Sequence, residues 1–273
     1  VTWLSSLTDR FIHHAPGKAL NLQTGIYGSA CVDKQKRLWI ATEGYGLLQY
    51  DIVTGEAEFY LIDKTSYSVH NSNVIKTVYA EDDCIWCGTA LGEVYRFDLA
   101  TRRFSLFYKY PVELVLYDIV RDADGNLWVS SSKGGYALTC FTPSGERKTE
   151  FRGLKGEKLH FSSIRCLAEE SPGVLLIGMR SAGLHRYDTR TGEVTNFNSS
   201  RPERERRIPS NYISSILPVK SGDVWVSTYG GGIFQLDKQG GVLRWVTEKD
   251  GLMGGDICKL LEGADGNLWM SSL

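Results

Sequence analysis

The chain has 273 residues, of which 42% are apolar and 11% aromatic, and its 31 basic and 32 acidic side chains leave a formal net charge of -1. This composition is typical of a globular protein with a substantial core, and it excludes a disordered chain. Because the charge is nearly balanced, we expect no direct contact between this segment and nucleic acid. No run of 18 apolar residues predicts a membrane span. The chain begins at Val1, and we expect it to be a segment of a longer protein.

A short strand centred on a tryptophan recurs along the chain. Its copies place the following residues at one equivalent position: Trp39 in RLWIAT, Trp86 in CIWCGT, Trp128 in NLWVSS, Leu176 in the degenerate VLLIGM, Trp225 in DVWVST and Trp269 in NLWMSS. Successive copies lie 42 to 49 residues apart, which is the length of a four-stranded propeller blade. We call these six residues the blade anchors, and we expect each to fill the space between its blade and the next.

Turn residues divide each unit into four strands. Asp124-Gly125 stands before one anchor strand and Asp265-Gly266 before another, and both pairs are typical of tight turns with a positive φ. Glycines follow most anchors by seven residues, and Thr-Gly pairs precede the last strand of two units. Helical periodicity is almost absent, so the predicted fold class is all-β, a propeller of four-stranded blades.

The two ends of the chain predict how the ring closes. Residues 1–11 align without a gap on residues 94–104, which form the outer half of another unit. The N-terminus would therefore add two outer strands to the two inner strands that end near Leu273, and such closure leaves no exposed sheet edge at the seam. We expect residues 1–273 to form a single β-propeller domain of six blades. A segment cut from a longer array would begin and end at equivalent points as well, so seven blades stay open for the intact protein.

Cysteines and histidines form no recognisable catalytic or metal-binding motif. Only Cys84 and Cys87 among the six cysteines are spaced as CxxC, and a zinc site needs a second such pair. An extended strand separates these two residues too far for a disulfide, so we expect packing roles. His185 occupies a third-strand position held by Leu48 and Phe234 in other units, and we expect it to pack or to lie at the surface rather than to act in catalysis. We predict no metal, no cofactor and no catalytic residue.

The unit DGNLWVSS…GG…L.RYD..TGE...F, followed by IPSNYISSI at Ile208–Ile216, resembles the two-component regulator propeller repeat. The resemblance implies the periplasmic sensor region of a hybrid two-component histidine kinase and response regulator. In that family the propeller precedes an immunoglobulin-like module, a transmembrane helix and kinase, receiver and DNA-binding domains. The resemblance also implies an oligosaccharide ligand, control of polysaccharide utilisation and no chemistry in this segment. Implied protein partners are an adjoining propeller or immunoglobulin-like domain and a second copy in a homodimer.

The mouth of the central channel is the expected ligand site, because loops of every blade converge there. Residues four positions after the anchors differ from unit to unit, which suits recognition of one asymmetric ligand. Aromatic rings would stack on a sugar, and charged or amide groups would bind its hydroxyl, sulfate or carboxylate groups. The alternative is that these are ordinary solvated loop residues. The predicted ligand-binding residues are Glu43, Tyr45, Lys133, Arg180 and Tyr229, with His160, Asn211 and Tyr212 from loops that enter the next blade.

Two other functions stay open at this point. Metal-dependent propeller lyases that inactivate streptogramins also contain DGNLW-like stretches, and here His160 with Glu43 is the one pair that could serve such chemistry. A purely structural propeller for docking or dimerisation is the second alternative. Metal-dependent turnover would favour the lyase, and dimerisation without ligand through an outer blade edge would favour the structural module.

Overall fold

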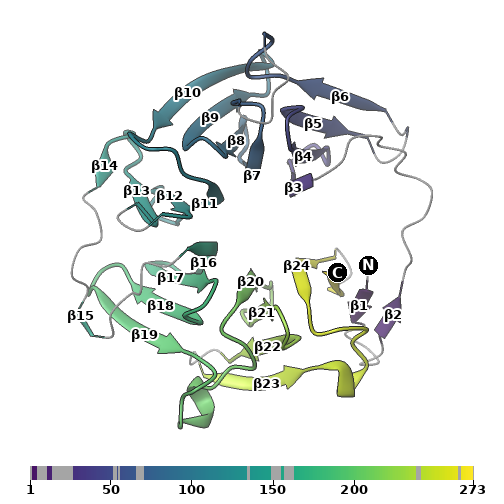
Figure 1. Cartoon of the computed structure of the whole chain (residues 1–273), viewed down its shortest axis with the longest axis vertical. Coiled ribbons are helices and arrows are strands. Elements are labelled where there is room, and N and C mark those ends of the chain that lie inside the picture. The colour runs from purple at the N-terminus through teal and green to yellow at the C-terminus, as the bar shows by residue number, and fades with distance from the viewer. Residues whose placement is uncertain are drawn as a thin grey trace.

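Six antiparallel sheets stand around a common centre (Figure 1). The computed structural model describes residues 2–4, 11–13, 27–51, 54, 56–65, 71–133, 136–148, 155–156, 163–237, 241–263 and 266–272. In each sheet, the strand that directly precedes the anchor strand lies nearest the ring centre, and the sheet extends from there to the rim. The predicted all-β propeller of six repeated units is confirmed.

Each sheet is one blade, and we number the blades in chain order. Blade I consists of β3 (Tyr27–Val32), β4 (Leu38–Thr42), β5 (Leu47–Tyr50) and β6 (Ala57–Tyr60). Blade II consists of β7 (Ile75–Ala80), β8 (Cys84–Thr89), β9 (Glu93–Asp98) and β10 (Arg103–Lys109). Blade III consists of β11 (Leu116–Arg121), β12 (Leu127–Ser131), β13 (Leu138–Phe141) and β14 (Arg147–Lys148). Blade IV is β16 (Ile164–Ser171), β17 (Val174–Met179), β18 (Leu184–Asp188), β19 (Glu193–Phe197), with β15 (Lys155–Gly156) parallel to β19. Blade V is β20 (Ile213–Pro218), β21 (Val224–Thr228), β22 (Ile233–Leu236), β23 (Val242–Val246). Two 3-10 helices, η1 (Arg204–Arg206) and η2 (Glu248–Asp250), lie in loops after β19 and β23.

Blade VI combines the two ends of the chain, as the alignment of the termini predicts. It consists of β24 (Ile257–Glu262), β25 (Leu268–Ser272), β1 (Thr2–Leu4) and β2 (Phe11–His13). Strand β1 pairs antiparallel with β25, and Trp3 stands opposite the blade anchor Trp269. The prediction of a composite blade is therefore confirmed.

Apolar clusters between neighbouring blades hold the ring together. In the described part of the chain, five clusters join blades I–II, II–III, III–IV, IV–V and V–VI. Each contains one anchor: Trp39, Trp86, Trp128, Leu176 or Trp225, all of them buried. The anchor of blade I, for example, lies 5.5 Å from the ring of Phe97 in blade II, centroid to centroid. Five of the six anchors therefore pack between neighbouring blades.

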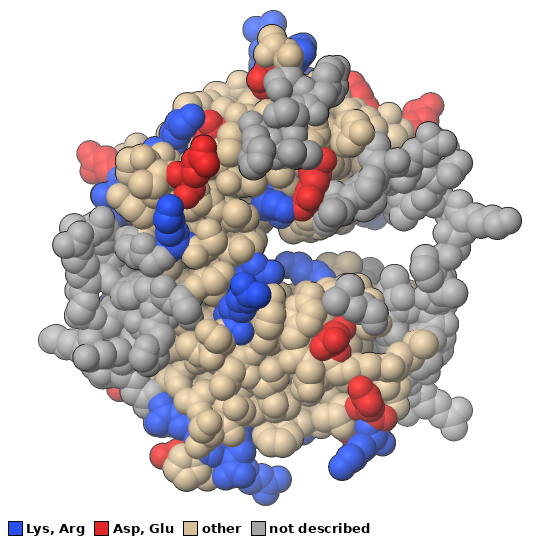
Figure 2. All heavy atoms as spheres, in the orientation of Figure 1, with Lys and Arg blue, Asp and Glu red and all other residues tan. Residues whose placement is uncertain are grey.

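The seam between blades VI and I differs from the other five interfaces. Trp269 is only half-buried, and Leu261, its cross-strand neighbour, is 60% exposed. The equivalent neighbour of Trp225 is Leu217, which packs against an interblade cluster. Figure 2 shows an open slot between blades VI and I. Closure of the ring by contact between these blades is therefore not confirmed, because the described residues form no apolar cluster there.

An aspartate before each of two anchor strands fixes the turn and the anchor together. The carboxylate of Asp122 accepts hydrogen bonds from the backbone N–H of Asn126 at 2.7 Å and from Nε1 of Trp128 at 2.7 Å. Asp33 holds Trp39 in the same way at 2.8 Å. Gly125 has the expected positive φ, at 79°. The aspartate that stabilises this turn is therefore Asp122, two residues before the one in the Asp-Gly pair.

Candidate functional site at the centre of the ring

Every inner strand carries a bulge at the same point. The register of β11 against β12, for example, shifts between Leu116 and Asp118, so Tyr117 has no partner in the ladder. A bulge turns a side chain away from the regular alternation of the strand, and it recurs here beside the loop that follows the anchor strand. The residues at this position in blades II to VI are Lys76, Tyr117, Arg165, Ser214 and Cys258.

Four side chains from blades III, IV and V form what we call the tyrosine–arginine cluster: Tyr117, Arg165, Tyr212 and Tyr229. The guanidinium carbon of Arg165 lies 4.1 Å from the ring centroid of Tyr117 and 5.7 Å from that of Tyr212. The rings of Tyr212 and Tyr229 are 4.5 Å apart, centroid to centroid, and tilted by 36°. All four side chains are half-buried, so each keeps part of its surface open to solvent.

The hairpin of β20 and β21 positions the two stacked tyrosines. Tyr212 immediately precedes β20 and Tyr229 immediately follows β21, and the backbone N–H of Tyr229 donates to the carbonyl of Tyr212 at 3.0 Å. The hydroxyl of Tyr229 lies 3.5 Å from Sγ of Cys258 in blade VI. This contact and burial raise the pKa of Tyr229 to about 12, so the phenol stays protonated at neutral pH and can act as a hydrogen-bond donor.

Positive charge predominates around this cluster. Arg165 forms no ion pair with any described residue, whereas Lys76, at the same position in blade II, pairs with Glu43. Asp118 follows Tyr117, but its carboxylate accepts backbone N–H bonds from Leu167 and Ile119, and burial raises its pKa. Lys and Arg side chains gather at the ring centre on the face seen in Figure 2. Such a site favours an anionic or hydroxyl-rich ligand over a cationic one.

Two of the predicted ligand-binding residues, Tyr212 and Tyr229, meet in the cluster. Arg180 is exposed in the loop after β17, and Lys133 reaches the carbonyl of Glu113 at 3.3 Å. Tyr45 is 45% exposed and packs against Phe59. Among the described residues, no hydrogen bond, ion pair or ring contact joins Arg180, Lys133 or Tyr45 to the tyrosine–arginine cluster.

The other predicted residues have structural contacts or lie outside the described part. The side-chain oxygen of Asn211 accepts the backbone N–H of Ser199 at 2.8 Å. Glu43 forms its ion pair with Lys76, and His160 lies outside the described residues. Of the two residues that a lyase would need, His160 and Glu43, the structure therefore describes only Glu43. His185 is fully buried beside Asn196, with 3.1 Å between Nε2 and Nδ2, so its predicted packing role is confirmed.

Tyr117 and Arg165 are site residues that the sequence prediction lacked. Each stands eleven residues before its blade anchor, as do Ser214 and Cys258. This fixed offset is visible in the sequence, but all of the predicted binding residues lie in loops and none lies within an inner strand. A bulge within a strand brings the two residues to the ring centre.

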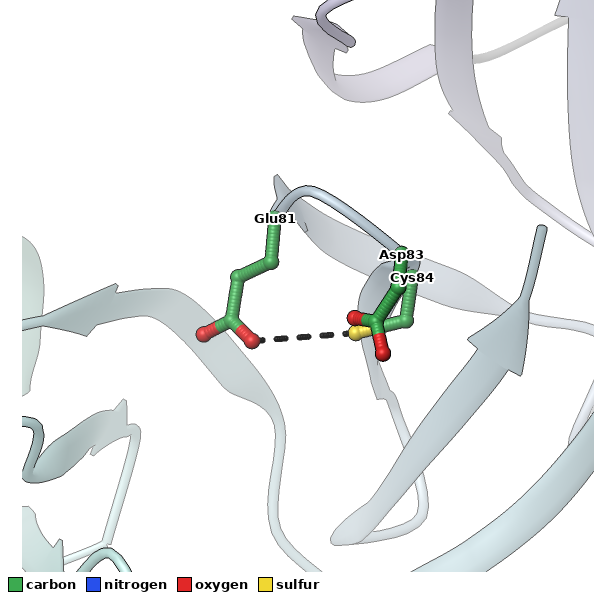
Figure 3. A group of neighbouring side chains, drawn as sticks. All are labelled: Glu81, Asp83 and Cys84. Carbon is green, nitrogen blue, oxygen red and sulfur yellow. Dashed lines mark hydrogen bonds between the residues drawn. The ribbon is translucent and has the colours of Figure 1, made fainter.

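Glu81, Asp83 and Cys84 form a candidate metal centre by distance alone, because their ligand atoms lie within 4.8 Å of one another (Figure 3). Glu81 also pairs with Arg121, and Asp83 pairs with Arg96 at 2.7 Å. Desolvation and the charge of Glu81 raise the pKa of the Cys84 thiol to about 12, which disfavours the thiolate that a metal requires. This arrangement fits an ion-pair network better than a metal site.

Comparison with known proteins identifies the repeat. Residues 110–133 and 207–230 match the family model described as two component regulator propeller. Two stretches of the chain thus match the two-component regulator propeller repeat. The two matched stretches hold Tyr117, Tyr212 and Tyr229, so three of the four cluster residues belong to the recognised repeats. No curated protein matches the chain in sequence.

Several solved structures share the fold of this chain. The extracellular domain of a chain described as a hybrid two component system, BT3049 from B. thetaiotaomicron, is 19% identical with a TM-score of 0.62, over 95% of this chain and 40% of that one. Virginiamycin B lyase from Staphylococcus aureus is 17% identical with a TM-score of 0.70, over 92% of this chain and 79% of the lyase. The WD40 propeller domain of Doa1 is 14% identical with a TM-score of 0.68, over 91% and 76%. The propeller thus spans less than half of the first of these chains. No helix among the described residues is long and apolar enough to cross a membrane.

Proposed function

We propose that this propeller is a ligand-binding sensor module in the extracytoplasmic, periplasmic part of a hybrid two-component signalling protein, and that it performs no chemistry of its own. The two-component regulator repeats support the signalling role. The observation that carries the binding role is the pair of stacked, half-buried tyrosines beside an arginine with no carboxylate partner among the described residues.

The proposed ligand is an oligosaccharide, whose recognition would regulate polysaccharide utilisation. A sugar presents an apolar ring face that packs on aromatic side chains and hydroxyl groups that need hydrogen-bond partners. Tyr212 and Tyr229 provide the rings, and the protonated phenol of Tyr229 and the guanidinium of Arg165 provide donors.

Signalling requires that the ligand favour one arrangement of the protein over another by its difference in binding energy. The tyrosine–arginine cluster joins blades III, IV and V, and Tyr229 contacts Cys258 of blade VI. A ligand there would touch several blades at once. We propose that it thereby changes the contact with an adjoining propeller or immunoglobulin-like domain, or the arrangement of a homodimer.

A thermal-shift screen of oligosaccharides against the whole extracytoplasmic region tests this function. A ligand at 100 times its dissociation constant stabilises the folded state by about 2.7 kcal/mol, which is a readily measured shift. We expect the shift to disappear in the double variant Tyr212→Ala, Tyr229→Ala and to persist in Trp245→Ala, which removes an exposed ring from the rim strand β23. Absence of any carbohydrate-dependent shift, or metal-dependent turnover of a substrate, would contradict the proposal.

A further inference from the structure

We infer that the ligand of this site is an acidic oligosaccharide, whose carboxylate or sulfate group binds the guanidinium of Arg165. The inference rests on the proposed function and narrows its ligand class.

Arg165 has cation–π contacts with two tyrosine rings and no ion pair with a described residue. Its guanidinium lies 4.1 Å from the ring of Tyr117 and 5.7 Å from that of Tyr212. A guanidinium that stacks through its face keeps its N–H groups free at its edge, and these groups match the two oxygens of a carboxylate or sulfate. The two tyrosines thus orient an anion receptor without neutralising it.

Two other basic side chains on inner strands, Lys76 and Arg121, have carboxylate partners. Lys76 pairs with Glu43 in the neighbouring blade, and Arg121 pairs with Glu81. Lys109, on the rim strand β10, also binds its acid, Glu93, at 2.9 Å. Within the described residues, Arg165 has no such partner, although it is half-buried and therefore partly desolvated. A partly desolvated arginine without a counter-charge is a favourable place for an anion.

Asp118, which directly follows Tyr117, does not fill this role. Its carboxylate accepts the backbone N–H of Leu167 at 2.8 Å and that of Ile119 at 3.0 Å. Burial raises its pKa, and the positive charge of Lys259 on β24 opposes that rise. Lys259 is exposed, so the ring centre offers a second cation to an anionic ligand.

The stacked tyrosines and the arginine favour a sugar that bears the charge over a free inorganic anion. Tyr212 belongs to both contacts, because its ring stacks on Tyr229 at 4.5 Å and faces Arg165. A saccharide ring packed on these tyrosines would hold its acidic substituent next to the guanidinium. Uronic acids and sulfated sugars both present an anionic group to the guanidinium, and comparing their binding affinities distinguishes them.

The test is calorimetry on the whole extracytoplasmic region with oligosaccharides of equal length in three forms: neutral, uronic-acid and sulfated. At least one acidic form should bind about tenfold or more tightly than the neutral one, with an affinity that falls as salt rises. Arg165→Gln should remove this preference, and Arg165→Lys should restore it only in part because ammonium lacks the planar fork. Lys76→Gln is the matched control, at the same bulge position but with its own carboxylate, and should keep the preference.

The outcomes separate this inference from the proposed function. If neutral sugars bind as tightly as acidic ones in the unsubstituted protein, or if Arg165→Gln leaves the preference intact, the acidic class is wrong while the sensor role stands. If inorganic sulfate binds as tightly as the sulfated sugar, the anion and not a sugar is the ligand, which also overturns the inference. If no sugar of any form binds, the proposed function fails as well.

Discussion

The ring of Tyr212 lies 4.5 Å from the ring of Tyr229, although sixteen residues separate them in the chain. The pairing of Ile213 with Thr228 brings them together, because each tyrosine flanks one member of that pair. The hairpin that packs the core of blade V therefore also brings together the two tyrosines of the proposed binding site.

Removing one stacked ring should weaken the proposed sugar binding without unfolding the propeller. We expect Tyr229→Ala to raise the dissociation constant about tenfold, which corresponds to about 1.4 kcal/mol of lost ring contact. Tyr229→Phe should cost less, because it keeps the ring and loses only the hydroxyl donor. Calorimetry measures both values, and an unchanged affinity in Tyr229→Ala would exclude this ring from the site.

The seam between blades VI and I predicts unequal costs for equivalent anchors. Trp39→Ala removes a fully buried ring and should lower the free energy of unfolding by about 3 to 5 kcal/mol. Trp269→Ala removes a half-buried ring and should cost less than about 2 kcal/mol. Urea unfolding of the two variants gives the comparison. Equal losses would mean that Trp269 is covered as fully as the other anchors.

Asp122 should matter more than Asp124 to the stability of blade III. Asp122→Ala leaves the backbone N–H of Asn126 and Nε1 of Trp128 without their acceptor, at an expected cost of about 2 to 3 kcal/mol. Asp124 is exposed, and Asp124→Ala should change stability by less than about 0.5 kcal/mol. Thermal unfolding of the two variants measures both losses of stability. A larger loss in Asp124→Ala than in Asp122→Ala would refute the turn-stabilising role assigned to Asp122.

Two aspartates should respond to pH in opposite directions. Backbone and hydroxyl hydrogen bonds from Thr101, with Arg96, lower the pKa of Asp98 to about 2 from an ordinary value of 3.8, so its contribution is present above that value and is lost as pH falls towards 2. Burial raises the pKa of Asp118, so folding favours its protonated form and its ionisation lowers stability as pH rises above 3.8.

The matching variants test these signs by urea unfolding between pH 2 and pH 7. The stability of Asp98→Asn relative to the unsubstituted protein should fall as pH rises from 2 to 4. That of Asp118→Asn should increase as pH rises from 4, because asparagine does not ionise. Asparagine also keeps an acceptor for the N–H groups of Leu167 and Ile119. Parallel pH profiles for the two variants would be incompatible with the opposite environments.

The repeated tryptophan made the architecture predictable from sequence. A large aromatic at intervals of 42 to 49 residues indicates the wedge between blades, and the alignment of residues 1–11 with 94–104 predicts the β1–β25 pairing. Closure at the seam was less predictable, because Trp269 fits the repeat while its burial depends on what faces it.

The site was predictable only in part. Variation after the anchors led to Tyr229, and the entry loop led to Tyr212, but composition gives no information on which loop residues converge. Tyr117 and Arg165 belong to strands that the pattern assigns to the core, and a one-residue bulge redirects them. Asn211 was expected in the site because it is a polar residue of an entry loop. Its side-chain oxygen instead accepts the backbone N–H of Ser199, which is a structural contact.

Hydroxyl-radical footprinting with the oligosaccharide that gives the largest thermal shift tests most directly whether ligand binds at the ring centre. The account predicts that saturating ligand reduces oxidation of Tyr212, Tyr229 and Tyr117, while the exposed rim residue Trp245 stays as reactive as in the free protein. Protection of Trp245 with unchanged oxidation of the three tyrosines would contradict it and would move the site to the outer edge of blade V.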